Sequence, residues 1–192
     1  MSSENREKIL EAALAVLGRE GYQNTSIKAI AEEAGVAQGL IHYYFKSKQE
    51  LVSAALLRCT EQIAVDLDAA GDVVAAFDVF KRNLPDKDGF WRLFVEMVGV
   101  GLHDTQLGTG VRDFIEADRD LVEQVGRRLL GEVAGEHTLR SLSAAVYAAN
   151  LGIVIQHLVD PAFDANAAVD ALAQMVMARA AQLTAGGVER VR

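Results

Sequence analysis

The chain has 192 residues, 51% of them hydrophobic and 24% charged, so it can bury a substantial core and is too apolar to be disordered. It is rich in alanine and contains two prolines, Pro85 and Pro161, a composition that favours an all-helical protein. The formal net charge is −8, but residues 1–50 carry 6 Lys+Arg against 7 Asp+Glu, so most of the excess negative charge lies in residues 51–192. A polyanion could therefore bind only at cations placed near the N-terminus.

Three further features bear on the setting of the protein. No apolar run approaches the roughly 20 residues that span a bilayer, and the N-terminus has no basic-then-apolar signal segment, so we expect no membrane association. The single cysteine, Cys59, cannot form an intrachain disulfide, which fits a cytoplasmic location. We expect Cys59 to be a packed thiol, with redox sensing as the alternative.

The first predicted helix spans residues 4–19. Its apolar residues recur at the i, i+3, i+4, i+7 spacing of an amphipathic helix, and Gly21 is placed to end it in a left-handed conformation. The apolar face consists of Leu10, Ala13, Leu14 and Leu17.

Two short helices and a longer one are predicted next, at residues 27–34, 38–45 and 48–70. Thr25 or Ser26 is expected to cap the first, and Gly35 to end it. Ser47-Lys48-Gln49-Glu50 has the form of a capping box, which indicates the start of the longer helix.

After Asp72 the pattern predicts larger helices separated by glycine or proline, near residues 72–83, 87–103, 109–131, 138–159 and 164–184. Helix 87–103 is apolar almost all round, so we expect other helices to enclose it. Helix 138–159 carries a seam of small residues, and helix 164–184 an apolar stripe that includes Leu172 and Val176. These two helices could close the monomer core, form half of a subunit interface, or both.

The segment from Thr25 to Leu51 carries the most informative motif. A small residue, Ala31, precedes Gly35 by four positions, and apolar residues follow at 36, 41 and 44. Two short helices that cross steeply need a small residue at the crossing, a glycine in the turn and apolar residues between them. This pattern is typical of a helix-turn-helix DNA-binding motif. The alternative is a helical hairpin with a purely structural role.

Helical periodicity predicts which side chains of this segment face outward. If Ile41, Tyr44 and Phe45 point into the core, the opposite face presents Gly39, Tyr43 and Lys46, flanked by Leu40 and His42. Gln38 lies in the first turn, where a recognition helix reaches base edges. Gly39 allows close approach of the backbone to DNA, whereas His42 and Tyr43 suit phosphate oxygens. Lys48 lies at a helix N-terminus and is expected to form a phosphate clamp.

The sequence T-x-x-x-x-I-A-x-x-A-G-V-x-x-G-x-x-x-x-Y-F-x-x-K-x-x-L closely resembles the N-terminal signature of TetR-family transcriptional regulators. The resemblance covers roughly residues 6–56. It implies an all-α fold with a helix-turn-helix domain, here residues 1–47, and a helical ligand-binding and dimerisation domain, residues 48–192. It also implies a homodimer, usually a repressor, that binds a palindromic operator in double-stranded DNA and responds to a small molecule. Carried over by position, the DNA contacts of the family fall on Lys28, Gln38, Gly39, Leu40, His42, Tyr43 and Lys48.

The chain departs from the family pattern at three positions. A serine or threonine is common where Ala37 stands, so a possible cap and phosphate contact is lost. A tyrosine is common at the position of His42, and a polar residue at that of Leu40, where leucine would contact a thymine methyl group or a sugar. These differences affect the expected operator sequence rather than DNA binding.

A group of apolar and aromatic residues in the C-terminal part could line a pocket for a mostly apolar ligand. Ordinary core packing is the alternative for each of them. Asn150 and His157, on an apolar helix, could donate hydrogen bonds to a pocket or across an interface. The candidate ligand-binding residues are Phe77, Trp91, Phe94, Met97, Phe114, Asp118 and Asn150; Arg92 and Glu96 are further candidates for holding a polar end of the ligand.

Enzyme, metal and cofactor functions find no support in the motifs. Gly99-Val100-Gly101 lacks the third glycine and the preceding strand of a dinucleotide loop, and no nucleophile elbow, P-loop or zinc-protease motif occurs. The four histidines (His42, His103, His137, His157) are too dispersed to indicate a metal site. The alternative from a different class is a helical ligand carrier or interaction module that does not bind DNA.

Overall fold

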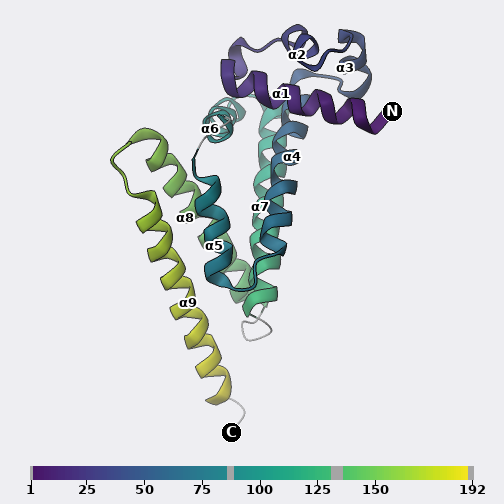
Figure 1. The fold of residues 1–192 in the computed structure, drawn as a ribbon. Coiled ribbons are helices and arrows are strands. Elements are labelled where there is room, and N and C mark those ends of the chain that lie inside the picture. Colours follow the sequence, from purple (N-terminus) through teal and green to yellow (C-terminus); the bar gives the residue numbers. More distant parts are fainter. Residues whose placement is uncertain (1, 86–88, 131–135, 190–192) are drawn as a thin grey trace. The chain divides into compact units, whose positions relative to one another are not determined.

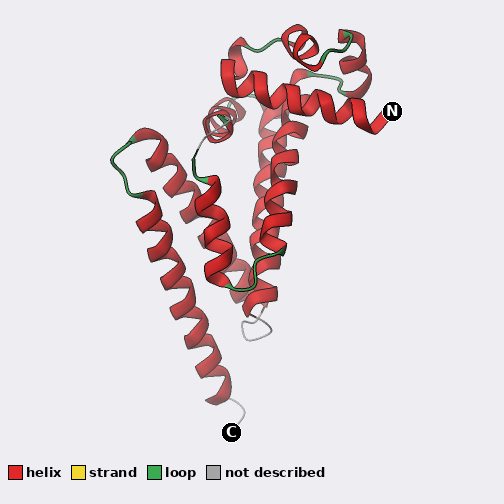
Figure 2. Cartoon of the chain, viewed as in Figure 1, coloured by secondary structure: helices red, strands yellow, loops and turns green. Residues whose placement is uncertain are grey.

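The computed structural model describes residues 2–85, 89–130 and 136–189, and these residues form helices without a β-strand (Figures 1 and 2). The all-α class expected from the composition is confirmed. The helices are α1 (Ser2–Asn24), α2 (Ile27–Ala34), α3 (Gln38–Tyr44), α4 (Lys48–Asp68), α5 (Val73–Asn83), α6 (Phe90–Gly101), α7 (Thr105–Leu130), α8 (Glu136–Val159) and α9 (Ala165–Glu189).

The chain divides into two compact units. Unit 1 comprises Met1–Gln62 and Asp86–Ala117, and unit 2 comprises Ile63–Pro85 and Asp118–Arg192. Unit 1 therefore joins the N-terminal helices to α6 and the first half of α7, while α4 and α7 contribute to both units. The domain boundary expected after residue 47 divides the chain by function, and it stays a prediction.

The core of unit 1 is built on the apolar face of α1. Leu10, Ala13 and Leu17 are buried as the periodicity predicted, and α1 packs across α2 and α6. The ion pair between Glu7 and Arg58 adds a polar contact between α1 and α4. The other large, fully buried side chains of this unit are Ile9, Val16, Ile30, Ile41, Leu51, Leu56, Met97, Leu107 and Phe114.

A close contact between two glycines brings α6 against α7 in unit 1. Gly101 of α6 lies against Gly108 of α7, where an added Cβ would meet backbone atoms. The sequence pattern predicted that the helix begins at residue 109, which is wrong. The helix begins at Thr105, because the Asp104 carboxylate caps it by accepting a hydrogen bond from the Leu107 N–H at 2.9 Å. This bond lowers the pKa of Asp104.

The start of α6 also differs from the prediction. Residues 87 and 88 of the predicted helix 87–103 lie outside the described residues, and so does residue 131 of helix 109–131. Gly89 adopts φ 70° and ψ 14° immediately before Phe90, and the position of a Cβ on Gly89 would lie 2.5 Å from the Gly18 carbonyl oxygen of α1. Glycine is required here for its positive φ and for the space.

Unit 2 is held together by α9, which packs against both α5 and α8. Lys81 of α5 forms an ion pair with Asp170 of α9. Arg128 of α7 donates hydrogen bonds to the carbonyl oxygens of Leu67 at 2.6 Å and Ala70 at 3.1 Å, and so satisfies carbonyl groups at the C-terminal end of α4.

Helix α8 has two faces of different character. One face is buried or half-buried and includes Leu139, Tyr147 and Val154. The opposite face is formed mostly by exposed small and apolar side chains, and we call it the α8 seam. It consists of Ala145, Ala148, Gly152, Ile155 and Val159.

The same helix corrects an expectation about apolar runs. Thr138–Val159 is long and apolar enough to cross a membrane by length and mean hydropathy, which sequence analysis did not anticipate. A single helix of this kind is weak evidence for a span, because a core helix of a soluble protein passes the same test. The packing of α8 against α9 accounts for its buried face, and an apolar partner on the α8 seam would account for the other.

Candidate nucleic-acid interface

The turn between α2 and α3 is built by local hydrogen bonds. Ser26 caps α2, because its Oγ accepts the Ala29 N–H at 3.1 Å. At the other end Gly35 adopts the left-handed conformation (φ 64°, ψ 33°). The Gly35 N–H bonds the Glu32 carbonyl and the Val36 N–H bonds the Ala31 carbonyl, which together form a Schellman motif. The predicted bounds of α2 and the role of Gly35 are confirmed.

The third helix, α3, presents the predicted residues outward. Gln38, Gly39, His42, Tyr43 and Lys46 are exposed and Leu40 is half-buried. Ile41 and Phe45 are buried, whereas Tyr44, expected in the core, is only half-buried; its ring meets that of Tyr43 edge-on at 5.1 Å. Tyr43 is 78% exposed, so its phenol projects into solvent beside the helix. Ala37 precedes α3 without a side-chain cap, as its departure from the family pattern predicted.

Two of the proposed cations lie on the surface. Lys28 on α2 is exposed and 3.8 Å from Glu32 one turn later, a pair that is easily separated because both groups are in solvent. The backbone N–H of Lys46 donates to Glu50 at 2.9 Å, and its side chain is exposed. Ser47 Oγ accepts the Glu50 N–H at 3.1 Å, so the predicted cap of α4 is present, although Glu50 reaches Lys46 rather than Ser47.

Lys48 differs from the exposed phosphate clamp that we expected. Its ammonium donates a hydrogen bond to the Tyr22 carbonyl and lies 4.2 Å from the centre of the Tyr22 ring. Burial lowers the pKa of Lys48, and the Glu96 carboxylate partly opposes this effect. An ammonium group has three donors, so donors remain for a phosphate. The role of Lys48 as a phosphate contact stays a prediction, and the structure adds a second role in the packing of α4 on Tyr22.

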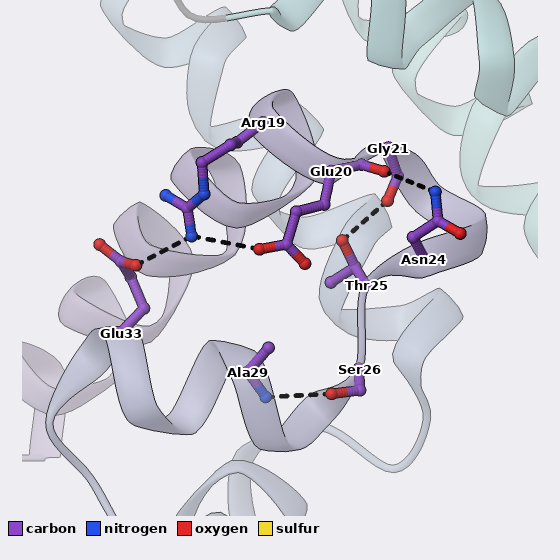
Figure 3. A network of polar contacts seen from close by, with 8 residues as sticks. All are labelled: Arg19, Glu20, Gly21, Asn24, Thr25, Ser26, Ala29 and Glu33. Carbon is purple, nitrogen blue, oxygen red and sulfur yellow. Dashed lines mark hydrogen bonds and ion pairs between the residues drawn. The ribbon is translucent and has the colours of Figure 1, made fainter.

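A network of polar side chains joins the end of α1 to α2 (Figure 3). Arg19 of α1 forms ion pairs with Glu20 at 3.3 Å and with Glu33 of α2 at 3.1 Å. The Thr25 hydroxyl donates to the Gly21 carbonyl at 2.7 Å, and the Asn24 amide donates to the Glu20 carbonyl at 3.1 Å. These bonds satisfy carbonyl groups at the point where Gly21 (φ 76°, ψ 167°) interrupts α1.

Glu96 of α6 also forms hydrogen bonds at the interruption of α1. Its carboxylate accepts the N–H groups of Tyr22 at 2.9 Å and Gln23 at 3.3 Å, the two residues that follow Gly21. These N–H groups are exposed by the interruption of α1 and would otherwise need another acceptor. The sequence suggested Glu96 as a contact for a ligand, whereas in the structure its carboxylate bonds the N–H groups that follow the interruption of α1 at Gly21.

The comparisons with known proteins match the part of the chain that contains α1 to α3 and the start of α4, which we call the head. Residues 9–55 match the model of the bacterial regulatory proteins of the tetR family. The repressor KstR of Mycolicibacterium smegmatis is 42% identical over 67 residues, which cover 35% of this chain and 33% of KstR. The regulator BetI of Proteus mirabilis is 38% identical over 63 residues, which cover 33% and 32%. The matched part thus spans about a third of the length of these relatives.

Residues 9–55 thus carry the N-terminal domain of the tetR family of bacterial regulatory proteins. Solved TetR-like structures share the fold over nearly the whole chain. A TetR transcription regulator from Haloarcula marismortui superposes with a TM-score of 0.65 at 18% identity, covering 96% of this chain and 98% of that one. A transcriptional regulator from Rhodococcus sp. Rha1 gives 0.68 at 20% identity, covering 90% and 95%.

The candidate ligand-binding residues do not all belong to one unit. Trp91, Phe94, Met97 and Phe114 are buried in unit 1, where the Phe94 and Phe114 ring centres are 4.9 Å apart. Phe77, Asp118 and Asn150 belong to unit 2. The aromatic residues of unit 1 thus have core partners of their own, and their role toward a ligand stays a prediction.

The sequence did not indicate the roles of two residues of unit 1. Tyr22 is buried and accepts Lys48 through its carbonyl, and Glu96 caps the residues that follow Gly21. A partial signal was available: Glu96 is one of only two charged residues on an apolar helix, a position where a charge needs a partner. Its partner could not be inferred, because the bonded backbone groups lie more than 70 residues away in the chain.

Proposed function

We propose that this protein is a homodimeric transcriptional regulator of the cytoplasm, most simply a repressor, that binds a palindromic operator through α3 and is released by a small molecule. The observation that carries the proposal is the outward face of α3. Exposed Gln38, His42 and Tyr43 project from this helix, and buried Ile41 anchors its opposite side. Exposed Lys46 follows two residues after the end of the helix.

The charge distribution determines how such a protein would bind DNA. Most of the chain is acidic, so attraction must come from local cations and from hydrogen bonds to phosphates. Each phosphate that a lysine neutralises contributes a slope of about −0.9 to log K against log salt. Affinity that depends on a few lysines of the head should therefore show a measurable slope for each of them.

A mobility-shift titration against duplex DNA from upstream of the protein's own gene tests DNA binding. Lys46→Ala should weaken binding to all sequences about equally and flatten the salt slope by about one unit. Lys48→Ala should do the same, with an added loss from its packing on Tyr22. Gln38→Ala should instead change the base preference within the operator.

Lys8→Ala is the matched control, because Lys8 is an exposed lysine on α1, paired with Glu4 and outside the proposed interface. It should leave the slope unchanged. If wild-type protein shifts no duplex specifically, the protein is better explained as a helical ligand carrier. If Lys46→Ala and Lys48→Ala leave both affinity and slope unchanged, the proposed phosphate contacts are wrong.

The proposed dimer interface is the exposed side of α8 and α9. The α8 seam is matched on α9 by exposed Ala167, Ala171, Met175 and Ala178, while the opposite side of each helix is buried in unit 2. Small side chains allow helices to approach closely, and a two-fold axis would bring each apolar surface against its own copy. Leu172 and Val176, which the apolar stripe suggested for this role, are each 8% exposed and pack within the monomer.

This burial determines which substitutions test the dimer. Met175→Arg, at a residue that is 62% exposed, should yield folded monomers with much weaker operator binding, measured by sedimentation and mobility shift. Asn166→Arg places the same charge at an exposed position on another side of α9 and shows the effect of charge alone. Leu172→Arg should unfold the protein instead. Folded Met175→Arg dimers with full operator affinity would contradict the proposed interface.

The effector is proposed as a small, mostly apolar molecule. A ligand changes operator affinity only if it binds one arrangement of the two heads better than another. The sequence suggested aromatic contacts for it, among them Trp91 in unit 1 and Phe77 in unit 2, and each of these stays a separate prediction. Screening apolar compounds for a raised melting temperature, a change in Trp91 fluorescence and release of operator DNA tests this part of the proposal.

A further inference from the structure

Arg6 lies near the start of α1, on the side of that helix that faces the end of α3 (Figure 1). Its guanidinium lies over the ring of Phe45, 5.6 Å from the ring centre. Phe45 is buried whereas Arg6 is exposed, so the ring covers one face of the guanidinium and solvent reaches the rest. A cation over an aromatic ring is attracted and held in place, which leaves the N–H groups at the edge of the guanidinium free to donate.

Arg6 differs from the neighbouring cations of α1 in its lack of a carboxylate partner. Lys8 is paired with Glu4, and Arg19 with Glu33. Within the described residues the Arg6 guanidinium forms no ion pair, and the positions three and four residues away along α1 hold no acidic side chain. In a chain of net charge −8, an exposed arginine that the fold leaves unpaired is available to an anion outside the chain.

A series of aromatic rings connects Arg6 to the outward face of α3. The exposed ring of Tyr43 meets that of Tyr44 edge-on at 5.1 Å, and the Tyr44 ring centre lies 6.3 Å from that of Phe45. Phe45 has extended backbone (φ −136°, ψ 122°), so the side chain of the next residue, Lys46, points away from the buried ring into solvent. Two cations from different elements, Arg6 of α1 and Lys46 of the link to α4, thus flank the end of α3.

The position beyond the end of α3 suits a phosphate better than a base. A helix that lies in the major groove, which is about 12 Å wide, has a phosphate backbone along each edge of the groove. Cations that flank the end of such a helix are placed at an edge and not over the base pairs. A guanidinium also bonds a phosphate with two parallel N–H groups, which an ammonium cannot do.

We propose that Arg6 binds a backbone phosphate of the DNA duplex, so that the DNA-binding surface extends from α3 onto the start of α1, with the Phe45 ring holding the guanidinium in position. Lys8, two residues further along α1, points to nearly the opposite side of the helix and shares a shallow surface groove with Glu11 and Glu33. Its acidic surroundings make it a poor phosphate contact. The inference rests on the proposed function and adds a contact to it.

The salt dependence of DNA binding tests this contact. Full-length wild-type protein, Arg6→Gln and Arg6→Lys are titrated by fluorescence anisotropy, over a series of salt concentrations, against two duplexes. One duplex comes from upstream of the protein's own gene, and the other is a scrambled duplex of the same base composition.

Arg6→Gln should weaken binding to both duplexes by about tenfold, because a phosphate carries no sequence information. It should also flatten the slope of log K against log salt by about 0.9 for each protomer bound. Arg6→Lys keeps the charge and should keep the slope. The Tm of Arg6→Gln should fall by no more than about 4 °C, because an exposed cation–ring contact contributes little to stability.

Lys8→Gln is the matched control, because it removes the same charge from nearly the opposite side of α1, and it should leave the slope unchanged. Equal flattening in Lys8→Gln would overturn the proposal, since only net charge would then matter. Weaker binding of Arg6→Gln with an unchanged slope would also overturn it, because Arg6 would then act only by packing on Phe45. If wild-type protein binds both duplexes equally while Arg6→Gln flattens the slope, sequence-specific regulation fails and the Arg6 contact stands. If wild-type protein binds neither duplex, both proposals fail.

Discussion

Unit 1 and the buried face of α8 differ in whether their polar groups have hydrogen-bond partners. Where α1 is followed by α2, the side chains of Ser26, Thr25 and Glu96 each form a hydrogen bond with a backbone group that has no partner within its own helix. On α8, Asn150 Oδ1 and His157 Nδ1 are buried atoms for which the described part of the chain offers no hydrogen-bond partner. Polar groups of the first kind are satisfied by the fold, whereas the fold leaves those of the second kind without a hydrogen bond.

The largest expected effect on stability concerns the close contact between Gly89 and α1 in unit 1. Gly89→Ala would place a Cβ 2.5 Å from the Gly18 carbonyl oxygen at a positive φ, so backbone of α1 or α6 must shift. We expect a loss of about 2–4 kcal/mol in the free energy of unfolding, measured by urea denaturation. Gly99→Ala, on the same helix with open space around it, should gain about 0.5–1 kcal/mol. Similar values for both variants would contradict the close contact.

The next effect concerns the hydrogen bonds of Glu96, which we expect to stabilise unit 1. Glu96→Ala leaves the Tyr22 and Gln23 N–H groups without their acceptor, and we expect a loss of about 2 kcal/mol in urea denaturation together with weaker operator binding. Glu96→Gln keeps a carbonyl acceptor and should lose less. Replacement without any loss of stability would place Glu96 among the polar groups that the fold does not need.

Gly35 should give a smaller effect. Its φ of 64° strains any L-residue, but a Cβ there meets nothing within 4 Å, so Gly35→Ala should cost only about 1 kcal/mol in the unfolding free energy. Gly39→Ala is the matched change four residues later, inside α3. It should stabilise the fold by about 0.5–1 kcal/mol while weakening operator binding, because the added methyl group faces the proposed DNA surface.

The smallest effect concerns pH. Burial raises the pKa of Tyr147, so the folded protein holds this proton more tightly than the unfolded chain. Its contribution to stability is complete below the unfolded tyrosine value of about 10 and is lost as pH rises above it. Absorbance near 295 nm during alkaline titration should show Tyr147 ionising only when the protein unfolds. The Tyr147→Phe variant should keep the early part of this curve unchanged; a reduced early phase would show an accessible hydroxyl.

The helix-turn-helix could be predicted from sequence because its signals are local. Ser26 and Gly35 flank α2 at its two ends, and both act on groups within five residues. The predicted start of α7 was wrong because the Asp104 cap was missed and because Gly108 lies inside the helix, where it packs against Gly101. This second contact is tertiary and could not be inferred from the local sequence. Lys48 was assigned to DNA alone because its contact with Tyr22 joins residues 26 positions apart.

The orientation of α9 shows a different limit. Val169, Leu172 and Val176 form one apolar side, and Ala167, Ala171 and Met175 form another. Hydrophobic periodicity identifies which residues share a side, but two apolar sides on one helix give no reason to choose which one is buried. The same holds for Asn150, whose position on α8 was known from the sequence but whose surroundings were not.

The joint between α1 and α6 has a consequence for exchanging parts between family members. Gly18 and Gly21 stand on the N-terminal side of any graft made after residue 47, whereas Gly89 and Glu96 stand on the other side. A chimera that imports a foreign head must therefore bring a small residue opposite Gly89 and an interrupted α1 for Glu96 to cap. The modularity of this protein depends on these four residues as much as on the choice of crossover point.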